Sequence, residues 1–322
     1  MAARKKSGRK TAEKKTPLKL SLPLWILVLL LLTGVGYAAS MELGYVKQPD
    51  INKLAQDKEI SADVTVHYID VGQGDCCLIT AGNYNILVDA GESECGKTVT
   101  DYLKKLNITK LDYVIATHPH SDHIGGIPEV IGSFEIGKIF MPKITGDMTP
   151  TTKTYENLIN AIKAKEMKAT AAKPGLKYTI KVTDSSNAVM EFIAPNSENY
   201  KDLNNYSAVF KFTYGEQSFL FTGDAEDVSE KEILKSGADI SSSVLKTGHH
   251  GSKSSSTSSF LAKVKPQICV IMSGEGNTYG HPDEEAVERM NVYTDKIYRT
   301  DLNGNIVITT DGKQLSVKCD KS

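Results

Sequence analysis

The chain has 322 residues, of which 40% are hydrophobic and 24% are charged. This ordinary globular composition excludes wholesale disorder, a collagen-like chain and a multi-span membrane protein. The net charge of −1 conceals an asymmetry, because residues 1–20 carry eight Lys/Arg and one Glu, a net +7, which leaves −8 for the rest. The net negative charge of residues 21–322 argues against a broad nucleic-acid-binding surface. A local basic groove is still compatible with this charge.

An uncharged apolar stretch occupies residues 22–39. A helix of this length, at about 1.5 Å per residue, just spans a hydrocarbon core of about 30 Å. The basic segment before this stretch, residues 1–20, is expected to stay on the cytoplasmic side of the membrane. We therefore expect a basic cytoplasmic tail at 1–20, a transmembrane anchor at 21–40 and everything later outside the cell membrane. A cleaved signal peptide is the alternative, because small residues end the stretch, and it would make the protein secreted.

After a polar linker at 41–60, the apolar pattern predicts alternating strands and helices in one domain, 61–322. Strands are predicted at 63–70, 76–80, 85–89, 111–116, 138–141, 178–182, 189–193, 208–214, 218–221, 243–246 and 267–272. Helices are predicted at 97–106, 124–131, 155–167, 228–235, 258–264 and 283–290. A final strand pair, 305–309 and 314–318, flanks the turn signal Asp311-Gly312. This order predicts an α/β fold, a four-layer αββα sandwich of two mixed sheets with helices outside.

Four candidate metal ligands lie within six residues after the strand predicted at 111–116, namely His118, His120, Asp122 and His123. In extended backbone, residues two apart point the same way, so His118 and His120 can bind one metal. The chain is expected to bend after His120, so that the side chains of Asp122 and His123 can turn towards a second metal. A chance cluster would need three of the seven histidines of the chain. The cluster therefore predicts a hydrolytic metal site.

Further candidates follow later strands. Asp224 comes after the strand at 218–221, beside a glycine that allows close backbone approach, and is predicted to bridge two metals. A helix-capping role is its structural alternative. Of His249 and His250, one is expected to complete the second metal site and the other to hold the bridging oxygen or contact substrate. His281 precedes a helix and is either a substrate contact or an ordinary surface histidine.

The pattern His118-x-His120-x-Asp122-His123, followed by Asp224 and His249-His250-Gly, resembles the metallo-β-lactamase-fold hydrolases. Motifs at 69–75, 87–91, 203–207 and 273–282 are similar to the soluble hydrolase domain of ComEC-type competence (DNA-uptake) proteins. The resemblance covers about residues 62–319. It implies a metallo-β-lactamase-like domain and favours His250 as the metal ligand. Mixed imidazole and carboxylate ligands suit two divalent cations, Zn²⁺ or Mn²⁺.

The chain departs from the family pattern in two ways. Full-length competence channels carry many membrane spans, so a DNA-channel role is not implied for a chain with one apolar stretch. Many members also supply a third histidine to the first metal, but no histidine lies between His123 and His249. The matching region reads Asn204-Asn205-Tyr-Ser207. The first site is therefore expected to have only His118, His120 and Asp224. Asp75 and Asp89 are expected to tie loops beneath the site.

The leading functional hypothesis is metal-dependent hydrolysis of a phosphodiester. Asp122 is expected to orient the attacking water as well as bind metal. His249 and His281 are expected to donate to the transition state or leaving group.

Extracellular DNA or RNA is the expected substrate. A local phosphate track is predicted from Lys246, Lys253, Lys263 and Lys265, with an ordinary solvated face as the alternative. Two other functions stay open: hydrolysis of a small or cell-surface ester, such as a phosphorylcholine ester or a lactone, and a non-catalytic binding module with a degenerate metal site.

Overall fold

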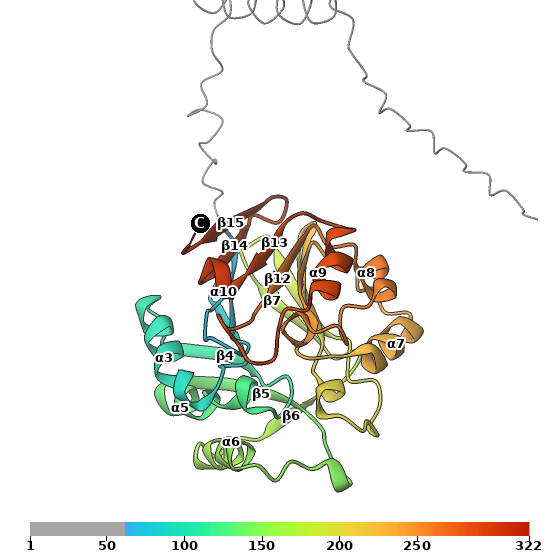
Figure 1. Ribbon diagram of the computed structural model, residues 1–322. Helices are drawn as coiled ribbons and strands as arrows, with labels where there is room; N and C mark the ends of the chain where they lie inside the picture. Colours follow the sequence, from blue (N-terminus) through green and yellow to red (C-terminus); the bar gives the residue numbers. More distant parts are fainter. Residues whose placement is uncertain (1–61, 322) are drawn as a thin grey trace, which may run out of the picture. The chain divides into compact units, whose positions relative to one another are not determined.

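The computed structural model describes residues 62–321, which form two mixed β-sheets packed face to face with helices on both outer surfaces (Figure 1). The predicted four-layer sandwich is confirmed. The predicted tail, membrane helix and linker all lie outside the described residues. Among residues 62–321, no helix combines the length and apolarity needed to cross a bilayer.

The first sheet has eight strands in the order β15-β14-β1-β2-β3-β4-β5-β6. These are β1 (Val64–Tyr68), β2 (Cys77–Ala81), β3 (Tyr84–Val88), β4 (Lys110–Ile115), β5 (Glu135–Pro142), β6 (Ala169–Ala172), β14 (Ile306–Thr310) and β15 (Leu315–Cys319). Pairing is antiparallel from β15 to β3 and parallel from β3 to β6. The β14–β15 hairpin turns at Gly312, whose φ of 88° is open to glycine because it has no Cβ.

The second sheet has seven strands in the order β13-β12-β11-β10-β9-β8-β7. These are β7 (Lys177–Lys181), β8 (Asn187–Phe192), β9 (Phe210–Tyr214), β10 (Gln217–Phe221), β11 (Val244–Lys246), β12 (Ile268–Ile271) and β13 (Ile297–Arg299). Pairing is antiparallel from β7 to β10 and parallel from β10 to β13. In β9, every second residue is buried, as expected of a strand with one face on the core.

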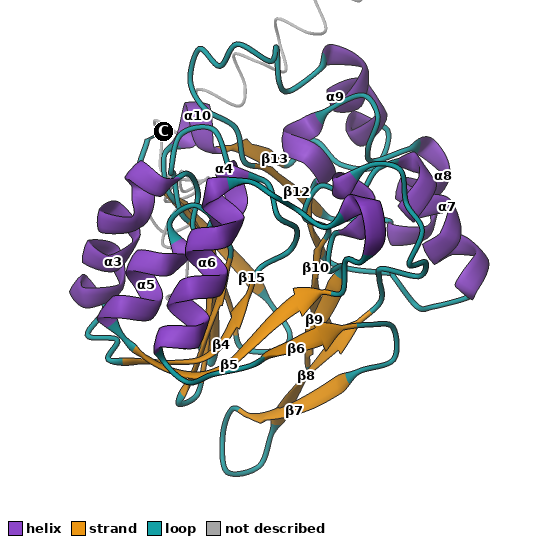
Figure 2. Cartoon of the chain, turned by 90° about the horizontal axis from the view of Figure 1, so that it is seen from below, coloured by secondary structure: helices purple, strands orange, loops and turns teal. Residues whose placement is uncertain are grey.

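Two groups of helices form the outer layers (Figure 2). The first sheet is covered by α3 (Gly96–Lys105), α5 (Ile127–Ser133) and α6 (Lys153–Ala164), with the short α4 (Ser121–Ile124) beside them. The second sheet is covered by α7 (Asp227–Ser236), α8 (Ser258–Val264) and α9 (Glu284–Asn291), and the one-turn α10 (Thr300–Asn303) precedes β14. In α3, Val99 and Leu103 are buried at the spacing of one helix face.

Aromatic side chains fill the space between the two sheets. The rings of Phe210 and Phe221 stack with centroids 4.7 Å apart, and Phe192 packs on Phe210 at 5.8 Å. Each of these side chains is buried. Burial of such a side chain stabilises the fold by roughly 1.5–3 kcal/mol. This close-packed core gives the loops at the sheet edge a rigid base.

The helix predicted at 124–131 is wrong in extent, because the structure has two helices, α4 and α5, separated by Gly125 and Gly126. The two glycines lie against the backbone that follows β3. A Cβ on Gly125 would lie 2.4 Å from Ser93 N, and one on Gly126 would lie 2.3 Å from Ala90 O. The close approach requires glycine and turns the chain after the histidine cluster.

The candidate ligands collect at one edge of the sandwich. Each follows the carboxyl end of a strand that has a parallel neighbour, which is where α/β sheets place ligand sites. Asp89 follows β3, His118 and His120 follow β4, Asp224 follows β10, His249 and His250 follow β11, and His281 follows β12.

Candidate metal centre

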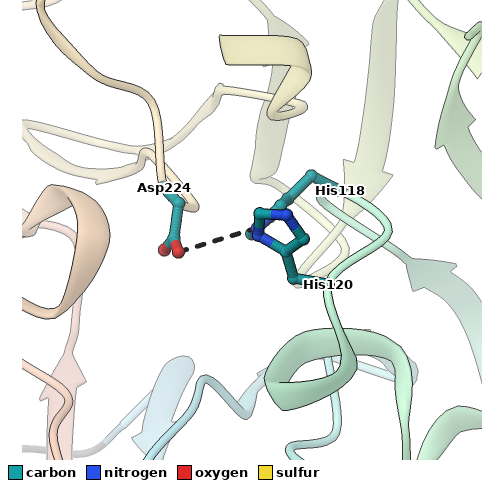
Figure 3. A group of neighbouring side chains, drawn as sticks. All are labelled: His118, His120 and Asp224. Atoms are coloured by element: carbon teal, nitrogen blue, oxygen red, sulfur yellow. Dashed lines mark hydrogen bonds and ion pairs between the residues drawn. The ribbon is translucent and has the colours of Figure 1, made fainter. Parts of the chain in front are cut away.

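The first ligand group comprises His118, His120 and Asp224, whose side chains face one another across the sheet edge (Figure 3). His118 Nε2 lies 3.6 Å from Asp224 Oδ2 and 3.0 Å from His120 Nδ1. His118 and Asp224 are buried, whereas His120 is half-buried and lines a cavity. Two imidazoles and a carboxylate form a donor set that suits zinc and leaves one side open.

The second ligand group comprises Asp122, His123 and His250. His250 Nε2 lies 3.1 Å from Asp122 Oδ2. Asp224 also reaches this group, because its Oδ2 lies 3.2 Å from His123 Nε2 and 3.5 Å from His250 Nε2. Asp224 therefore contacts both groups and stands where a carboxylate can bridge two metals. The arrangement is that of a dinuclear metal centre.

Two buried atoms in this centre test whether a cation fits. Among the described residues, His123 Nε2 and Asp224 Oδ1 are buried and have no hydrogen-bond partner. An unsatisfied buried polar atom costs about 1–3 kcal/mol, so a native site normally supplies a partner. Both atoms are lone-pair donors that a divalent cation accepts. The residues therefore fit bound metal.

The charges of the centre are strongly coupled. Burial lowers the pKa of His123 and His250, but Asp224 and Asp122 outweigh it and raise both pKa values well above the usual range. Burial raises the pKa of Asp224, yet the facing imidazoles hold it well below its usual range. Cations that bind here must displace protons from these histidines. Metal affinity is therefore expected to fall as the pH falls.

Two carboxylates support the ligands from beneath. Asp89 accepts hydrogen bonds from Thr117 N at 2.8 Å and Thr117 Oγ1 at 2.6 Å, and its Oδ2 lies 2.9 Å from His123 Nδ1. Asp75 Oδ1 lies 3.4 Å from His250 Nδ1 as an opposite charge, while the hydrogen bond of this nitrogen is to Met272 O at 2.9 Å. Partners on the far ring nitrogen fix the orientation of a ligating histidine. Both residues lie where the sequence places them, beneath the metal centre.

The predicted phosphate track is wrong at Lys246. This side chain is buried, forms an ion pair with Asp75 and donates to Gly223 O at 3.1 Å. Burial lowers the pKa of Lys246, but Asp75 and Asp224 raise it overall, so the side chain stays charged. The reason is its position on β11, a central strand covered on both faces. Lys253, Lys263 and Lys265 are exposed.

His249 lies beside the metal centre and has a different partner from His250. Its Nδ1 lies 3.0 Å from Glu226 Oε1, and its Nε2 lies 3.9 Å from Asp224 Oδ2. Both histidines have left-handed backbone, with φ of 47° and 54°. Such backbone costs of order 1–3 kcal/mol in a non-glycine residue and is typical of functional sites. Because of this backbone conformation, the adjacent imidazoles of His249 and His250 contact different partners.

The sequence interpretation missed Glu226. Its Oε1 also accepts a hydrogen bond from Ser254 Oγ at 2.8 Å, and its hydrogen bond with His249 lowers the pKa of the carboxyl group. Its position two residues after Asp224 could have indicated a functional residue, but an acidic residue there is equally typical of the start of a helix. Glu226 fixes the orientation of His249 as Asp89 fixes that of His123.

His281 joins His249 at the cavity wall. Their ring centroids lie 5.4 Å apart, and His281 Nδ1 lies 3.6 Å from Asp283 Oδ2. Burial lowers the pKa of His281. The cavity measures about 670 Å³ and is open to solvent. It is lined by Gln73, Pro119, His120, Ser121, Asp122, Asp147, Met148, Thr149, Pro150, Thr151, Thr152, Thr154, Leu203, Asn204, Asp224, His249, His250, Tyr279 and His281.

An asparagine occupies the region where many family members supply a third histidine. Asn204, in the 3-10 turn Leu203–Tyr206, is buried and lines the cavity, and its Oδ1 has no hydrogen-bond partner among the described residues. Asn205 points elsewhere, because its Oδ1 accepts from Ser229 N at 3.0 Å. The first ligand group therefore has no third imidazole.

Residues 69–274 match the family model described as Metallo-beta-lactamase superfamily. "ComE operon protein 3" of Bacillus subtilis (strain 168) is 27% identical over 265 residues, which cover 77% of this chain and 33% of that protein. "Competence protein ComA" of Neisseria gonorrhoeae is 30% identical over 249 residues, which cover 76% of this chain and 32% of that protein. The chain thus spans about a third of the length of these relatives.

Among solved structures, a mutant of CmlA beta-hydroxylase superposes with a TM-score of 0.50 at 11% identity, covering 86% of this chain and 60% of that one. At this identity the likeness shows the fold alone. The resemblance inferred from the sequence motifs is confirmed by the family model and the competence-protein relatives. The chain is a member of the metallo-β-lactamase superfamily, whose members are generally metal-dependent hydrolases, and it is related to the ComEC-type competence proteins.

Proposed function

We propose that the protein is a dinuclear metal-dependent phosphodiesterase that acts on DNA or RNA outside the cell membrane, to which residues 21–40 anchor it. The observation that carries the proposal is the position of Asp224 between two ligand groups at the floor of an open cavity. The competence and recombination functions named for its relatives support nucleic acid as the substrate class.

Six residues would hold the metals. The first ion would be bound by His118, His120 and Asp224, and the second by Asp122, His123, Asp224 and His250. When bound, two divalent cations supply Lewis-acid activation of water and of a phosphoryl oxygen. Imidazole and carboxylate donors suit zinc, and they also accept manganese.

The remaining polar groups would position water, substrate and protons. Asp122 borders the cavity, so its carboxylate can accept a hydrogen bond from the attacking water and orient it. Glu226 accepts the hydrogen bond of His249 Nδ1, so a His249 imidazolium, protonated on both nitrogens, would present Nε2–H to donate a proton to the leaving oxygen. His281 faces the same space and can donate to a phosphoryl oxygen.

The test is a substrate panel with the full chain in detergent micelles, loaded with zinc or manganese. Bis-p-nitrophenyl phosphate, single- and double-stranded DNA, RNA, a phosphorylcholine ester and a lactone would be compared. His120→Ala removes one ligand and is expected to abolish turnover while leaving the fold intact. Best turnover of nucleic acid, weakening steeply as salt rises, supports the proposal.

Other results in this panel contradict it. Turnover of only the phosphorylcholine ester or lactone, with little salt dependence, would assign the small-ester function. No turnover of any substrate, together with fewer than about one tightly held metal per chain, would show that the protein is a non-catalytic binding module. N-terminal sequencing of the mature protein decides between the anchor and a cleaved signal peptide, since cleavage would remove residues 1–39.

A further inference from the structure

One aromatic side chain stands at the mouth of the metal cavity. Tyr279 is 71% exposed, although it lines the same cavity as His249 and Asp224. Among the described residues that line this cavity, it is the single Phe, Tyr or Trp. Its ring therefore stands where a molecule that enters the cavity can contact it.

The loop around Tyr279 is fixed by one side chain. Asn277 Oδ1 accepts hydrogen bonds from Tyr279 N at 3.2 Å and His281 N at 3.1 Å. Asn277 Nδ2 donates to Gly274 O at 2.9 Å and to His281 O at 2.6 Å. The loop is also attached to the opposite sheet, because Gly274 N donates to Gln73 Oε1 at 3.2 Å. The backbone that carries the exposed ring is therefore organised before any ligand binds.

Two aromatic contacts connect the ring of Tyr279 to the metal centre. It stacks on the ring of His281 with centroids 6.1 Å apart and an interplanar angle of 16°. His281 in turn meets His249 edge to face at 5.4 Å, and His249 Nε2 lies 3.9 Å from Asp224. One face of the tyrosine ring is thus backed by an imidazole, while the residue stays largely open to solvent.

We infer that the open face of Tyr279 stacks on the nucleobase next to the scissile phosphodiester, which makes this loop a base-binding subsite. The inference rests on the proposed phosphodiesterase function and names the residue that would contact a base of the DNA or RNA substrate. Tyr279 and Asp224 line the same cavity, so a base stacked on the ring would leave its attached phosphate free to extend towards the bridging carboxylate. Stacking tolerates any sequence, because every base has a π face.

A quaternary ammonium group, as in phosphorylcholine, is the other ligand that an aromatic face attracts. Sites for such cations surround the group with several aromatic rings, in an aromatic cage. Here a single ring lines the described cavity, and an imidazole is stacked against it. A planar, neutral ligand that needs one face fits this arrangement better.

The experiment measures binding and cleavage of two fluorescein-labelled 12-mers by the full zinc-loaded chain. One carries adenine bases, and the other has the same phosphate backbone with abasic tetrahydrofuran residues. Loss of one base–aromatic stack is expected to raise the Kd of Tyr279→Ala for the adenine 12-mer roughly tenfold or more. The Kd for the abasic 12-mer is expected to stay unchanged. Tyr279→Phe keeps the ring and should retain the preference for bases.

Val292→Ala is the matched surface control, because Val292 is 76% exposed and lies outside the cavity lining. It is expected to bind both 12-mers like the wild type. Equal loss of affinity for both 12-mers in Tyr279→Ala, or no loss for either, overturns the base-binding subsite. A phosphorylcholine ester whose turnover alone depends on Tyr279 overturns it as well.

The binding measurement separates this inference from the proposed function. If the wild type cleaves no phosphodiester but its binding depends on both Tyr279 and the bases, the subsite is supported and the phosphodiesterase is overturned. If the wild type cleaves both 12-mers equally and Tyr279→Ala does the same, the subsite fails and the phosphodiesterase stands. A wild type that neither binds nor cleaves the 12-mers overturns both.

Discussion

His123 Nδ1 lies 2.9 Å from Asp89 Oδ2, and Nε2 of the same imidazole faces Asp224 Oδ2 at 3.2 Å. Asp89 is itself held by two hydrogen bonds from Thr117. The position of one metal-facing nitrogen is therefore set by a carboxylate on the preceding strand end. The ligand and its support come from different strands, so the fold, more than local sequence, aligns them.

Asp89→Asn tests this support directly. An amide in place of the carboxylate weakens the hold on the His123 ring, and losses of 10- to 100-fold in metal affinity are typical of such changes. We expect a loss of this size for one of two bound zinc ions, measured by competition with a chromophoric chelator. Asp295→Asn, at an exposed site, is the control. Unchanged affinity for both ions in Asp89→Asn would contradict the role.

Lys246→Met is expected to destabilise the protein by about 3–5 kcal/mol, because it leaves Asp75 buried without its ion-pair partner. The measurement is urea unfolding in excess chelator, which separates folding from metal binding. Lys253→Met, at an exposed lysine, should change the free energy of unfolding by less than about 0.5 kcal/mol. A wild-type unfolding midpoint for Lys246→Met would contradict a stabilising role of the buried Lys246–Asp75 ion pair.

Glu230 is expected to make stability depend on pH. The side chain is buried and accepts hydrogen bonds from Thr257 N at 2.9 Å and Thr257 Oγ1 at 2.6 Å. Burial raises its pKa from 4.5 to about 7, and the hydrogen bonds offset only part of that effect. The folded protein therefore holds a proton that the unfolded chain has released. The contribution of Glu230 to the free energy of unfolding falls as the pH rises from about 4.5 to 7.

Glu230→Gln removes this titration. Relative to the wild type, the variant should gain up to about 3 kcal/mol of stability between pH 5 and pH 8. Urea unfolding of both proteins at the two pH values, again in excess chelator, gives the difference. The same stability difference at both pH values would show that Glu230 does not titrate in this range.

Much of the fold follows from local pattern. The buried strands β10 and β12 and the amphipathic helix α3 carry periodic apolar residues, and the structure has them within a few residues of their predicted limits. The histidine cluster could also be identified, because its four ligands are adjacent in sequence. Because each follows a predicted strand, Asp224 and one of His249 and His250 are expected to meet this cluster, and the family resemblance favours His250.

Other features depend on contacts between distant segments. Strand β6 consists of Ala169-Thr-Ala-Ala172, which lacks the large apolar residues that mark a strand, and it forms by pairing with β5. Glu226 acquires its function only when β11 brings His249 beside it. In the sequence, Lys246 looks like a surface lysine. It is buried because β11 lies between β10 and β12.

The break between α4 and α5 gives a test of one such contact. Gly125→Ala would place a Cβ 2.4 Å from Ser93 N and 2.6 Å from Ser121 O, backbone atoms that cannot move away freely. We expect a loss of about 1–3 kcal/mol in the free energy of unfolding. Gly132→Ala in α5 meets nothing within 4 Å and should gain about 0.5–1 kcal/mol. Thermal unfolding compares the two, and equal effects would contradict the close approach.

Asp224 contacts both ligand groups, and we propose that it joins them into one dinuclear centre. Elemental analysis of the purified full chain and of Asp224→Asn, after dialysis against metal-free buffer, tests it most directly. We expect two divalent cations per wild-type chain, and an Asp224→Asn variant that keeps its circular dichroism spectrum but loses most of both cations. Two cations retained by Asp224→Asn, or a wild type that turns over substrate with one or none, would contradict it.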